Sequence, residues 1–274
     1  MRKFKRLFFG LVISISASML AQNNAYSTLF DIPYYDLKNQ DSDDYRRRKA
    51  VLNIHFPREA KPHPVIIWFH GGGLSSGDHA IPEALKETGN VIVSADYRLV
   101  PKVKPENCID DAAAAIAWVF RNIHTYNGDN NRIFVAGHSA GGYLALMTVM
   151  DPTRLNAYGL DANQIAGLVP FSGHTITHFE IRKQRGIPAE RALIDSLAPL
   201  FFVRKEAPPV RLITGDREKE LLGRYEENAY FYRMMKVAGH QDIEIYELDG
   251  YGHLMTEPAF PLLLEFVTAY SQGD

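Results

Sequence analysis

The sequence predicts an α/β fold in which a mostly parallel sheet carries helices on both faces. Short apolar runs alternate with longer segments of helical character along most of the chain. Most of these runs are apolar at every position, which is typical of parallel strands that are buried on both faces. No linker rich in Gly, Ser or Pro divides residues 22–274, so we expect a single domain there.

Seven segments are expected to form the strands. They are residues 51–56, 64–70, 90–96, 132–137, 165–171, 209–214 and 242–248. The first segment alternates apolar and polar residues, as a half-exposed strand does, whereas the next three are continuous apolar runs. Because right-handed crossovers connect strands of this kind, we expect a doubly wound sandwich.

Four segments are expected to form helices, namely residues 108–124, 140–150, 221–238 and 258–271. Asn107 can cap the first of these helices, and Gly239 can end the third. The second helix is apolar almost all round, which predicts that it is buried. Residues 174–199 form a connection longer than a usual crossover, so we expect a short lid or pocket wall there.

The composition excludes several classes of protein. With 46% hydrophobic and 23% charged residues, the 274-residue chain is not composed like a disordered protein. Its formal net charge of −2 gives no electrostatic support for a nucleic-acid partner. The one cysteine, Cys108, excludes an internal disulfide and a cysteine-based zinc site.

The first 21 residues are expected to be a secretory signal peptide. Residues 1–6 are basic, residues 7–20 form an apolar run without a charge, and cleavage is expected after Ala21. The alternative is an uncleaved membrane anchor, but this run is shorter than the roughly 20 residues that span a bilayer. We therefore expect a secreted or periplasmic protein whose mature chain, residues 22–274, has no stable membrane insertion.

Residues 137–141, Gly-His-Ser-Ala-Gly, match the pattern G-x-S-x-G. They follow an expected strand and open an expected buried helix, as a nucleophile elbow does. Glycine is needed on both sides because side chains would clash in so tight a turn. The pattern predicts that Ser139 is an exposed nucleophile in a strained backbone conformation, at the positive end of the following helix. The alternative is a plain Gly/Ser turn.

Residues 70–73, His-Gly-Gly-Gly, follow another expected strand. Three glycines let backbone N–H groups approach a substrate oxygen without interference from side chains. Together with the amide after the nucleophile they predict an oxyanion hole made of Gly72, Gly73 and Ala140. The alternatives are a simple turn or a phosphate-binding loop, but the G-x-x-x-x-G-K-[ST] pattern of phosphate loops is absent here.

With these two motifs the chain resembles the α/β-hydrolase superfamily, and more narrowly its hormone-sensitive-lipase-like and carbohydrate-esterase-like branch, which carries HGGG and GxSAGG. Residues 96–99 (Asp-Tyr-Arg-Leu), 110–113 (Asp-Asp-Ala-Ala) and 139–142 (Ser-Ala-Gly-Gly) match segments of that branch. The resemblance covers about residues 45–267 and implies the α/β-hydrolase fold and ester-type chemistry. Lipase-like members often carry a large N-terminal helical cap, whereas only about 30 residues of the expected mature chain precede the first expected strand here, so we expect an open site without a large cap.

The superfamily order Ser…acid…His indicates where the remaining catalytic residues lie. His253 stands directly after the last expected strand, where the general base belongs. Residues 215–220, Gly-Asp-Arg-Glu-Lys-Glu, follow the preceding expected strand, and the family's usual pattern at this place is G-x-x-D. In that register Glu218 is the acid, with Asp216 as the alternative and Glu220 as a third candidate.

Four other histidines lie near the motifs or in the long connection. We expect His70 to brace the glycine loop and the side chain of His138 to point away from the site. His174 and His178 have the spacing of a helical metal-binding pair, but the β-branched residues 175–177 disfavour a helix. We therefore expect these two to line the substrate pocket or lie on the lid, and we expect no metal site.

The motifs predict a serine hydrolase that needs no cofactor. In this reading Ser139 attacks an ester carbonyl, His253 takes its proton, and water hydrolyses the acyl-enzyme. The resemblance implies a small-molecule or carbohydrate ester substrate with a short acyl chain, such as acetyl or feruloyl groups on plant polysaccharides. One alternative is an amidase or peptidase of the formamidase-like or prolyl-oligopeptidase-like kind, and another is a non-catalytic binding protein of the same fold.

Overall fold

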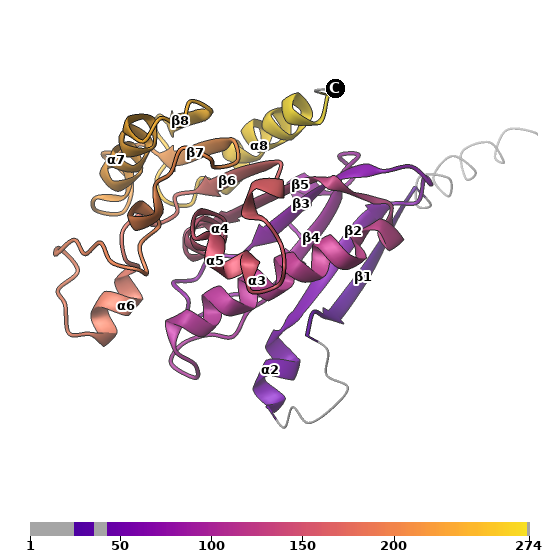
Figure 1. Cartoon of the computed structure of the whole chain (residues 1–274), viewed down its shortest axis with the longest axis horizontal. Helices are drawn as coiled ribbons and strands as arrows, with labels where there is room; N and C mark the ends of the chain where they lie inside the picture. The colour runs from indigo at the N-terminus through magenta and orange to yellow at the C-terminus, as the bar shows by residue number, and fades with distance from the viewer. Residues whose placement is uncertain (1–24, 36–42, 273–274) are drawn as a thin grey trace, which may run out of the picture.

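The computed structural model describes residues 25–35 and 43–272, so the predicted signal peptide lies outside the described residues. One eight-stranded sheet runs through the described part, in the order β1-β2-β4-β3-β5-β6-β7-β8. Figure 1 shows this sheet at the centre of the molecule with helices packed against it. None of the helices within these described ranges is long and apolar enough to cross a membrane.

The sheet is mostly parallel, as the sequence predicts. Only β2 runs opposite to its two neighbours, β1 and β4, while the other neighbouring strands are parallel. The strands are β1 (Tyr26–Pro33), β2 (Val51–Pro57), β3 (His63–Phe69), β4 (Val91–Ala95), β5 (Gly128–His138), β6 (Gly167–Phe171), β7 (Val210–Gly215) and β8 (Ile243–Leu248).

Helices cover both faces of the sheet, which confirms the predicted fold class. The α-helices are α2 (Asp44–Lys49), α3 (Pro105–Asn122), α4 (Ala140–Met150), α5 (Pro152–Asn156), α6 (Phe179–Gln184), α7 (Arg224–Val237) and α8 (Thr256–Ser271). Short 3-10 turns occur at Glu83–Leu85, Ile123–Tyr126, Ala162–Gln164 and Pro199–Phe202.

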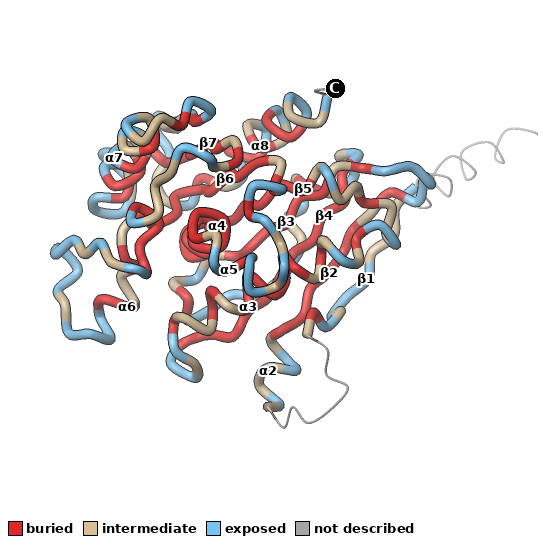
Figure 2. Tube along the Cα trace, viewed as in Figure 1, coloured by how far each residue is buried: buried red, intermediate tan, exposed pale blue. Residues whose placement is uncertain are grey.

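Alternate residues of β3 enter two separate cores. Val65 and Ile67 belong to the core under α3, α4 and α7, whereas Ile66 and Trp68 belong to the core under α8. This alternation follows from the two-residue period of a strand. Figure 2 shows that β3 and α4 are buried along almost their whole length, and β5 is buried from Ile133 to Gly137. The central strands are therefore anchored on both faces, which gives the residues at their ends fixed positions.

The edge strand β1 was not among the predicted strands. Its sequence has no regular alternation of apolar and polar residues, and its register with β2 shifts between Leu29 and Ile32. Asp31 has a φ of 54°, which interrupts the pleat at this point. Its exposed position at the edge of the sheet explains why no apolar run marks it.

Three of the four predicted helices have different bounds in the structure, and α8 begins at Thr256, two residues before its predicted start. α3 begins at Pro105 with Lys104 as its N-cap, and the side chain of Asn107 accepts a hydrogen bond from the Lys104 N–H at 3.2 Å. Asn107 therefore completes a capping box inside the first turn and is not the N-cap, because proline is favoured at the first helical position. α7 begins after Gly223, whose φ of 73° ends the preceding turn.

The long connection after β6 contains α6 and an exposed loop. Figure 1 shows α6 projecting from the body of the molecule at the carboxyl end of the sheet. In residues 25–35 and 43–272 no larger helical cap covers this edge. The predicted short lid segment thus corresponds to α6 and the loop that follows it.

Candidate active site

The carboxyl ends of β3 and β5 bring the two predicted motifs together. The two strands pair in parallel, with Phe69 opposite Gly137. The glycine loop therefore leaves β3 beside the point where the chain turns from β5 into α4. Ligand sites of open α/β sheets lie at this edge, outside the carboxyl ends of the strands.

Ser139 forms the sharp turn between β5 and α4. Its φ is 54° and its ψ is −113°, a conformation that residues with a side chain rarely adopt. A Cβ on Gly141 would lie 2.0 Å from the carbonyl oxygen of Phe69, and one on Gly137 would lie 2.7 Å from the same oxygen. The strained elbow expected from the pattern is therefore present, but Ser139 is only 7% exposed because it lies at the bottom of a cavity.

A chain of two hydrogen bonds joins Ser139, His253 and Glu220. Ser139 Oγ lies 2.9 Å from His253 Nε2, and His253 Nδ1 lies 2.9 Å from Glu220 Oε2. An ionised carboxylate can only accept, so Nδ1 carries the imidazole proton and Nε2 is left to accept from the serine hydroxyl. This is the geometry of a serine activated by a histidine that a carboxylate orients.

The prediction that Glu218 is the acid that contacts His253 is wrong, and so is the alternative prediction of Asp216. Glu218 is exposed, and the carboxylate in contact with His253 is that of Glu220. The amides of Lys219 and Glu220 both donate to the carbonyl of Asp216, at 2.9 and 2.8 Å. This turn carries the chain back toward His253, so the contact falls two residues later than the G-x-x-D register implies.

The surroundings of Glu220 keep its carboxylate ionised. Burial alone would raise the pKa of Glu220, but hydrogen bonds from His253 and Ser172 outweigh it and lower the pKa to about 2. The amide of Leu221 also donates to Oε2, at 2.8 Å. The side chain is 1% exposed, so these bonds form where water competes little for them.

Asp216 has a different position, at the base of the loop that carries His253. Its carboxylate accepts from the amide of Gly250 at 2.9 Å, and its own amide donates to the carbonyl of Tyr251 at 2.7 Å. Both contacts are made to the segment just before His253. Asp216 therefore fastens the loop after β8 and does not touch the imidazole.

The predicted oxyanion-hole residues lie beside Ser139. Gly72 and Gly73 line the same cavity as the serine, and Ala140 is the first residue of α4. Among the described residues, the amides of all three donate to no protein acceptor. These N–H groups are available to a substrate oxygen, as oxyanion stabilisation requires.

His70 braces the glycine loop, as expected. Its Nδ1 lies 2.7 Å from the carbonyl oxygen of Gly71, and its Nε2 lies 3.1 Å from Asp96 Oδ1. The ring stacks on Tyr97 with 4.4 Å between centroids. Contacts on two edges and one face hold the imidazole, and with it the start of the loop.

The prediction that His138 points away from the site is wrong. Its Nε2 lies 2.8 Å from the carbonyl oxygen of His253, and the two rings are 4.8 Å apart. Burial lowers the pKa of His138 to about 4, so the ring is neutral and donates its Nε2–H to that carbonyl. The motif marks Ser139 but carries no signal for this contact, because the direction of the neighbouring side chain depends on the strained turn.

Ser139 opens into a cavity of about 610 Å³ at the carboxyl edge of the sheet. Phe179, at the start of α6, forms part of its wall, and a Cβ on Gly73 would lie 3.0 Å from the Phe179 ring. Residues from five segments, at or after the ends of β3, β5, β6, β7 and β8, line the cavity: His70, Gly71, Gly72, Gly73, Gly77, Asp78, His138, Ser139, Phe179, Leu221, His253 and Leu254.

His174 and His178 are not among the residues that line this cavity. His174 is buried, with Nδ1 2.8 Å from Glu227 Oε1 and Nε2 2.7 Å from Arg224. His178 is the N-cap of α6 and accepts from the amide of Glu180. Within the part of the chain that the structure describes, no group of three or more His, Cys, Asp or Glu side chains is placed to bind a metal.

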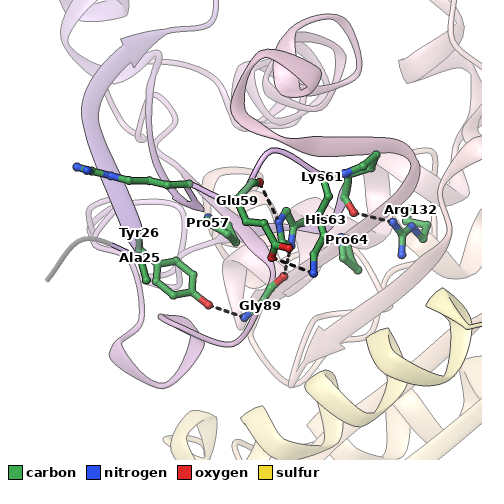
Figure 3. A pocket seen from close by; sticks show the side chains of 11 residues that line it. Ala25, Tyr26, Pro57, Glu59, Lys61, His63, Pro64, Gly89 and Arg132 are labelled. Atoms are coloured by element: carbon green, nitrogen blue, oxygen red, sulfur yellow. Dashed lines mark hydrogen bonds and ion pairs between the residues drawn. The ribbon is translucent and has the colours of Figure 1, made fainter. Parts of the chain in front are cut away.

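A second hollow of about 650 Å³ lies near the amino end of β3 (Figure 3). Polar side chains in its wall have partners within the wall. His63 Nδ1 lies 2.9 Å from the carbonyl oxygen of Gly89, and Lys61 Nζ lies 2.9 Å from Glu59 Oε2. None of the residues in its wall is a serine, cysteine or threonine. The hydrogen-bonded series of serine, histidine and carboxylate lies in the cavity at Ser139 and not in this hollow.

Comparison with known proteins agrees with this architecture. Residues 52–175 match the family model BD-FAE. The chain is 28% identical over 216 residues to Esterase LipC of Mycobacterium tuberculosis. The aligned region covers 70% of this chain and 53% of that protein. The chain thus spans about half the length of this curated relative.

Two solved structures share the fold. The truncated form of a carbohydrate esterase from gut microbiota is 20% identical, with a TM-score of 0.73 over 91% of this chain and 98% of that one. Esterase 2 of Thermogutta terrifontis with bound propionate is 24% identical, with a TM-score of 0.68 over 89% and 93%. With the parallel sheet and the nucleophile elbow, these similarities show that the chain has the α/β-hydrolase fold.

Proposed function

We propose that the chain is a serine esterase that hydrolyses short-chain acyl esters. The observation that carries this proposal is the hydrogen-bonded series Ser139–His253–Glu220, with 2.9 Å at each contact. It opens into a cavity lined by the amide-bearing glycine loop. A nucleophile, a base, a buried acid and amides for an oxyanion are the parts that acyl transfer needs.

In the acylation step Ser139 Oγ forms a bond to the ester carbonyl carbon, and its proton passes to His253 Nε2. The carbonyl oxygen becomes an oxyanion that accepts from the amides of Gly72, Gly73 and Ala140. Glu220 stabilises the imidazolium through Nδ1 and fixes the tautomer. The carbon–oxygen bond to the alcohol then breaks, and the alcohol leaves with the proton from Nε2.

In the deacylation step a water molecule takes the place of the alcohol. His253 accepts a proton from this water as its oxygen attacks the acyl-enzyme carbonyl. The same three amides bind the second oxyanion. Collapse returns the proton to Ser139 Oγ and releases the carboxylic acid, so the enzyme is regenerated without a cofactor.

For the substrate we infer acetyl or feruloyl esters of plant polysaccharides. The rim of the cavity is exposed, since Leu254 is 87% and Leu221 is 47% exposed, and a bulky alcohol can reach Ser139 past it. The match to BD-FAE and the likeness to a carbohydrate esterase support the same substrate class. The sequence-based expectation of export fits a polymeric substrate that lies outside the cell.

The test uses wild-type protein with p-nitrophenyl acetate, p-nitroacetanilide and acetylated xylan. We expect hydrolysis of both esters and at least a hundredfold lower kcat/KM for the anilide. A fluorophosphonate should label one residue, and peptide mapping should place the label on Ser139. Failure of the label to attach, together with no turnover of any ester, would contradict the proposal, and faster turnover of the anilide would favour an amidase.

Export is tested separately, because it depends on the first 21 residues. We expect the N-terminus of the protein recovered from the periplasm or the culture medium to be Gln22. Protein that retains Met1 or stays in the membrane fraction would contradict the proposed secretion.

A further inference from the structure

We propose that Ser172 is a positioning residue, which holds the Glu220 carboxylate in the orientation that receives the Nδ1–H of His253. This inference rests on the proposed function, because it assigns a role in the same hydrolytic site. Ser172 belongs to neither of the predicted motifs. It is the first residue after β6, and it is fully buried.

The side chain of Ser172 donates a hydrogen bond to Glu220 Oε1. The same oxygen has one other donor, the amide of Gly215, at the longer distance of 3.3 Å. The opposite oxygen, Oε2, is shared by the amide of Leu221 and His253. Without the Ser172 hydroxyl, Oε1 would keep only the weaker contact, and the carboxylate could rotate about its terminal torsion.

The backbone of Ser172 is strained, with a φ of 47°. Glycine or asparagine adopts this left-handed region more readily than serine does. A strained residue that persists in a fully buried position is a reason to look for a functional contact. The contact here is the hydroxyl, which glycine would lack.

The surrounding structure holds Ser172 in this conformation. Its amide donates to the carbonyl of Ile213 at 2.7 Å, and its own carbonyl accepts from the buried guanidinium of Arg224. Arg224 is fixed in turn by Glu227 at 2.7 Å. The preceding residue, Phe171, accepts the amide of Ser139 at 2.8 Å. These backbone contacts therefore hold Ser172 in a fixed position between Ser139 and Glu220.

The experiment compares Ser172→Gly with Ser172→Ala. Both variants remove the hydroxyl, but glycine also relieves the left-handed strain, whereas alanine retains it. Glu87→Gly is the matched control, because Glu87 has a φ of 57° and is exposed outside the site. The measurements are kcat and KM for p-nitrophenyl acetate and the Tm of each variant.

We expect kcat to fall roughly 10- to 100-fold in both Ser172 variants, which is the range for a lost hydrogen bond to a charged group. KM should change less than about threefold, because substrate contacts are intact. Ser172→Gly should have a higher Tm than Ser172→Ala despite the equal loss of activity. Glu87→Gly should keep the wild-type kcat.

Two results would overturn the inference while leaving the proposed function intact. One is an active wild type with both Ser172 variants within about threefold of its kcat. The other is a kcat that follows Tm, with Ser172→Gly near wild type and Ser172→Ala impaired, since the backbone conformation would then matter and the hydroxyl would not. An inactive wild type would overturn the proposed function and this inference together.

Discussion

Glu220 Oε2 lies 2.9 Å from His253 Nδ1, on the opposite edge of the imidazole from the Ser139 hydroxyl. The carboxylate comes from the loop after β7 and the histidine from the loop after β8. Two neighbouring parallel strands thus deliver the acid and the base to one edge of the sheet. The serine reaches the same edge from β5.

Glu220→Gln should lower kcat for p-nitrophenyl acetate by a factor on the order of 10⁴, as loss of the acid does in other serine hydrolases. The amide group can donate to His253 and thereby stabilise the wrong tautomer. Glu218→Gln is the matched control, because Glu218 is exposed and only two residues away. A large loss in Glu218→Gln with little loss in Glu220→Gln would return the role of acid to Glu218.

Asp216 should affect activity through the loop that it holds. Asp216→Asn keeps an oxygen that can accept from the Gly250 amide, so kcat should fall less than about tenfold. Asp216→Ala removes this acceptor, and we expect a further decrease in kcat as the loop before His253 loosens. Asp249 lies next to Gly250 in the exposed turn after β8, so Asp249→Ala serves as the control for loss of a carboxylate and should keep the wild-type kcat. Equal activity of all three variants would show that the Asp216–Gly250 bond does not position His253.

The central part of the site was predictable from the sequence, because the chemistry follows local patterns. Ser139 lies in a tight Gly-flanked turn at a strand end, and His253 follows the last strand. Glu220 was only the third candidate for the acid, and the sequence could not favour it over Glu218 and Asp216, since its position depends on a turn closed by backbone hydrogen bonds to Asp216. One sequence does not reveal how many residues such a turn contains.

The same distinction applies to the fold. The buried central strands were recognised because their apolar runs reflect burial on both faces. β1 was missed because an irregular edge strand needs no apolar run. The contact between His138 and the His253 carbonyl was missed for another reason, which is that side-chain direction after a strained turn is set by tertiary packing.

The stability of the protein should depend on pH through Glu220. The pKa of Glu220 in the folded protein is about 2, below the ordinary value of 4.5, because hydrogen bonds from His253 and Ser172 outweigh burial. The folded state therefore binds this proton less readily than the unfolded state does. The stabilisation is full above about pH 4.5 and is lost as the pH falls toward 2.

This pH dependence is checked with the Tm of wild type and Glu220→Gln between pH 2 and pH 7. The difference in Tm should be largest from pH 5 upward and should shrink as the pH falls. Glutamine does not titrate, so the variant reports the contribution of all other groups. A difference that stays constant across the range would contradict the lowered pKa of Glu220.

Short acyl chains should be preferred over long ones. Phe179 narrows the cavity next to Gly73, and the described residues include no large cap to bury a long chain. kcat/KM for p-nitrophenyl esters should therefore fall from butyrate to decanoate. In Phe179→Ala each additional buried methylene can contribute about 0.8 kcal/mol, or roughly fourfold in kcat/KM, so the optimum should move to longer chains.

Exposed Phe201 supplies the control for the loss of an aromatic ring. Phe201→Ala should keep the wild-type order of substrates. A wild-type kcat/KM that rises steadily from acetate to decanoate would show that the cavity accommodates long chains and that Phe179 does not limit them.

The most direct test of the account is hydrolysis of p-nitrophenyl acetate by Ser139→Ala, with the Tm measured on the same sample. Ser139 supplies the nucleophile, and its side chain contributes little to packing, so kcat/KM should fall to the background of the uncatalysed reaction while the Tm stays within a few degrees of wild type. Fluorophosphonate labelling should disappear in the same variant. Residual turnover within about tenfold of wild type by a folded Ser139→Ala protein would contradict the claim that Ser139 is the nucleophile.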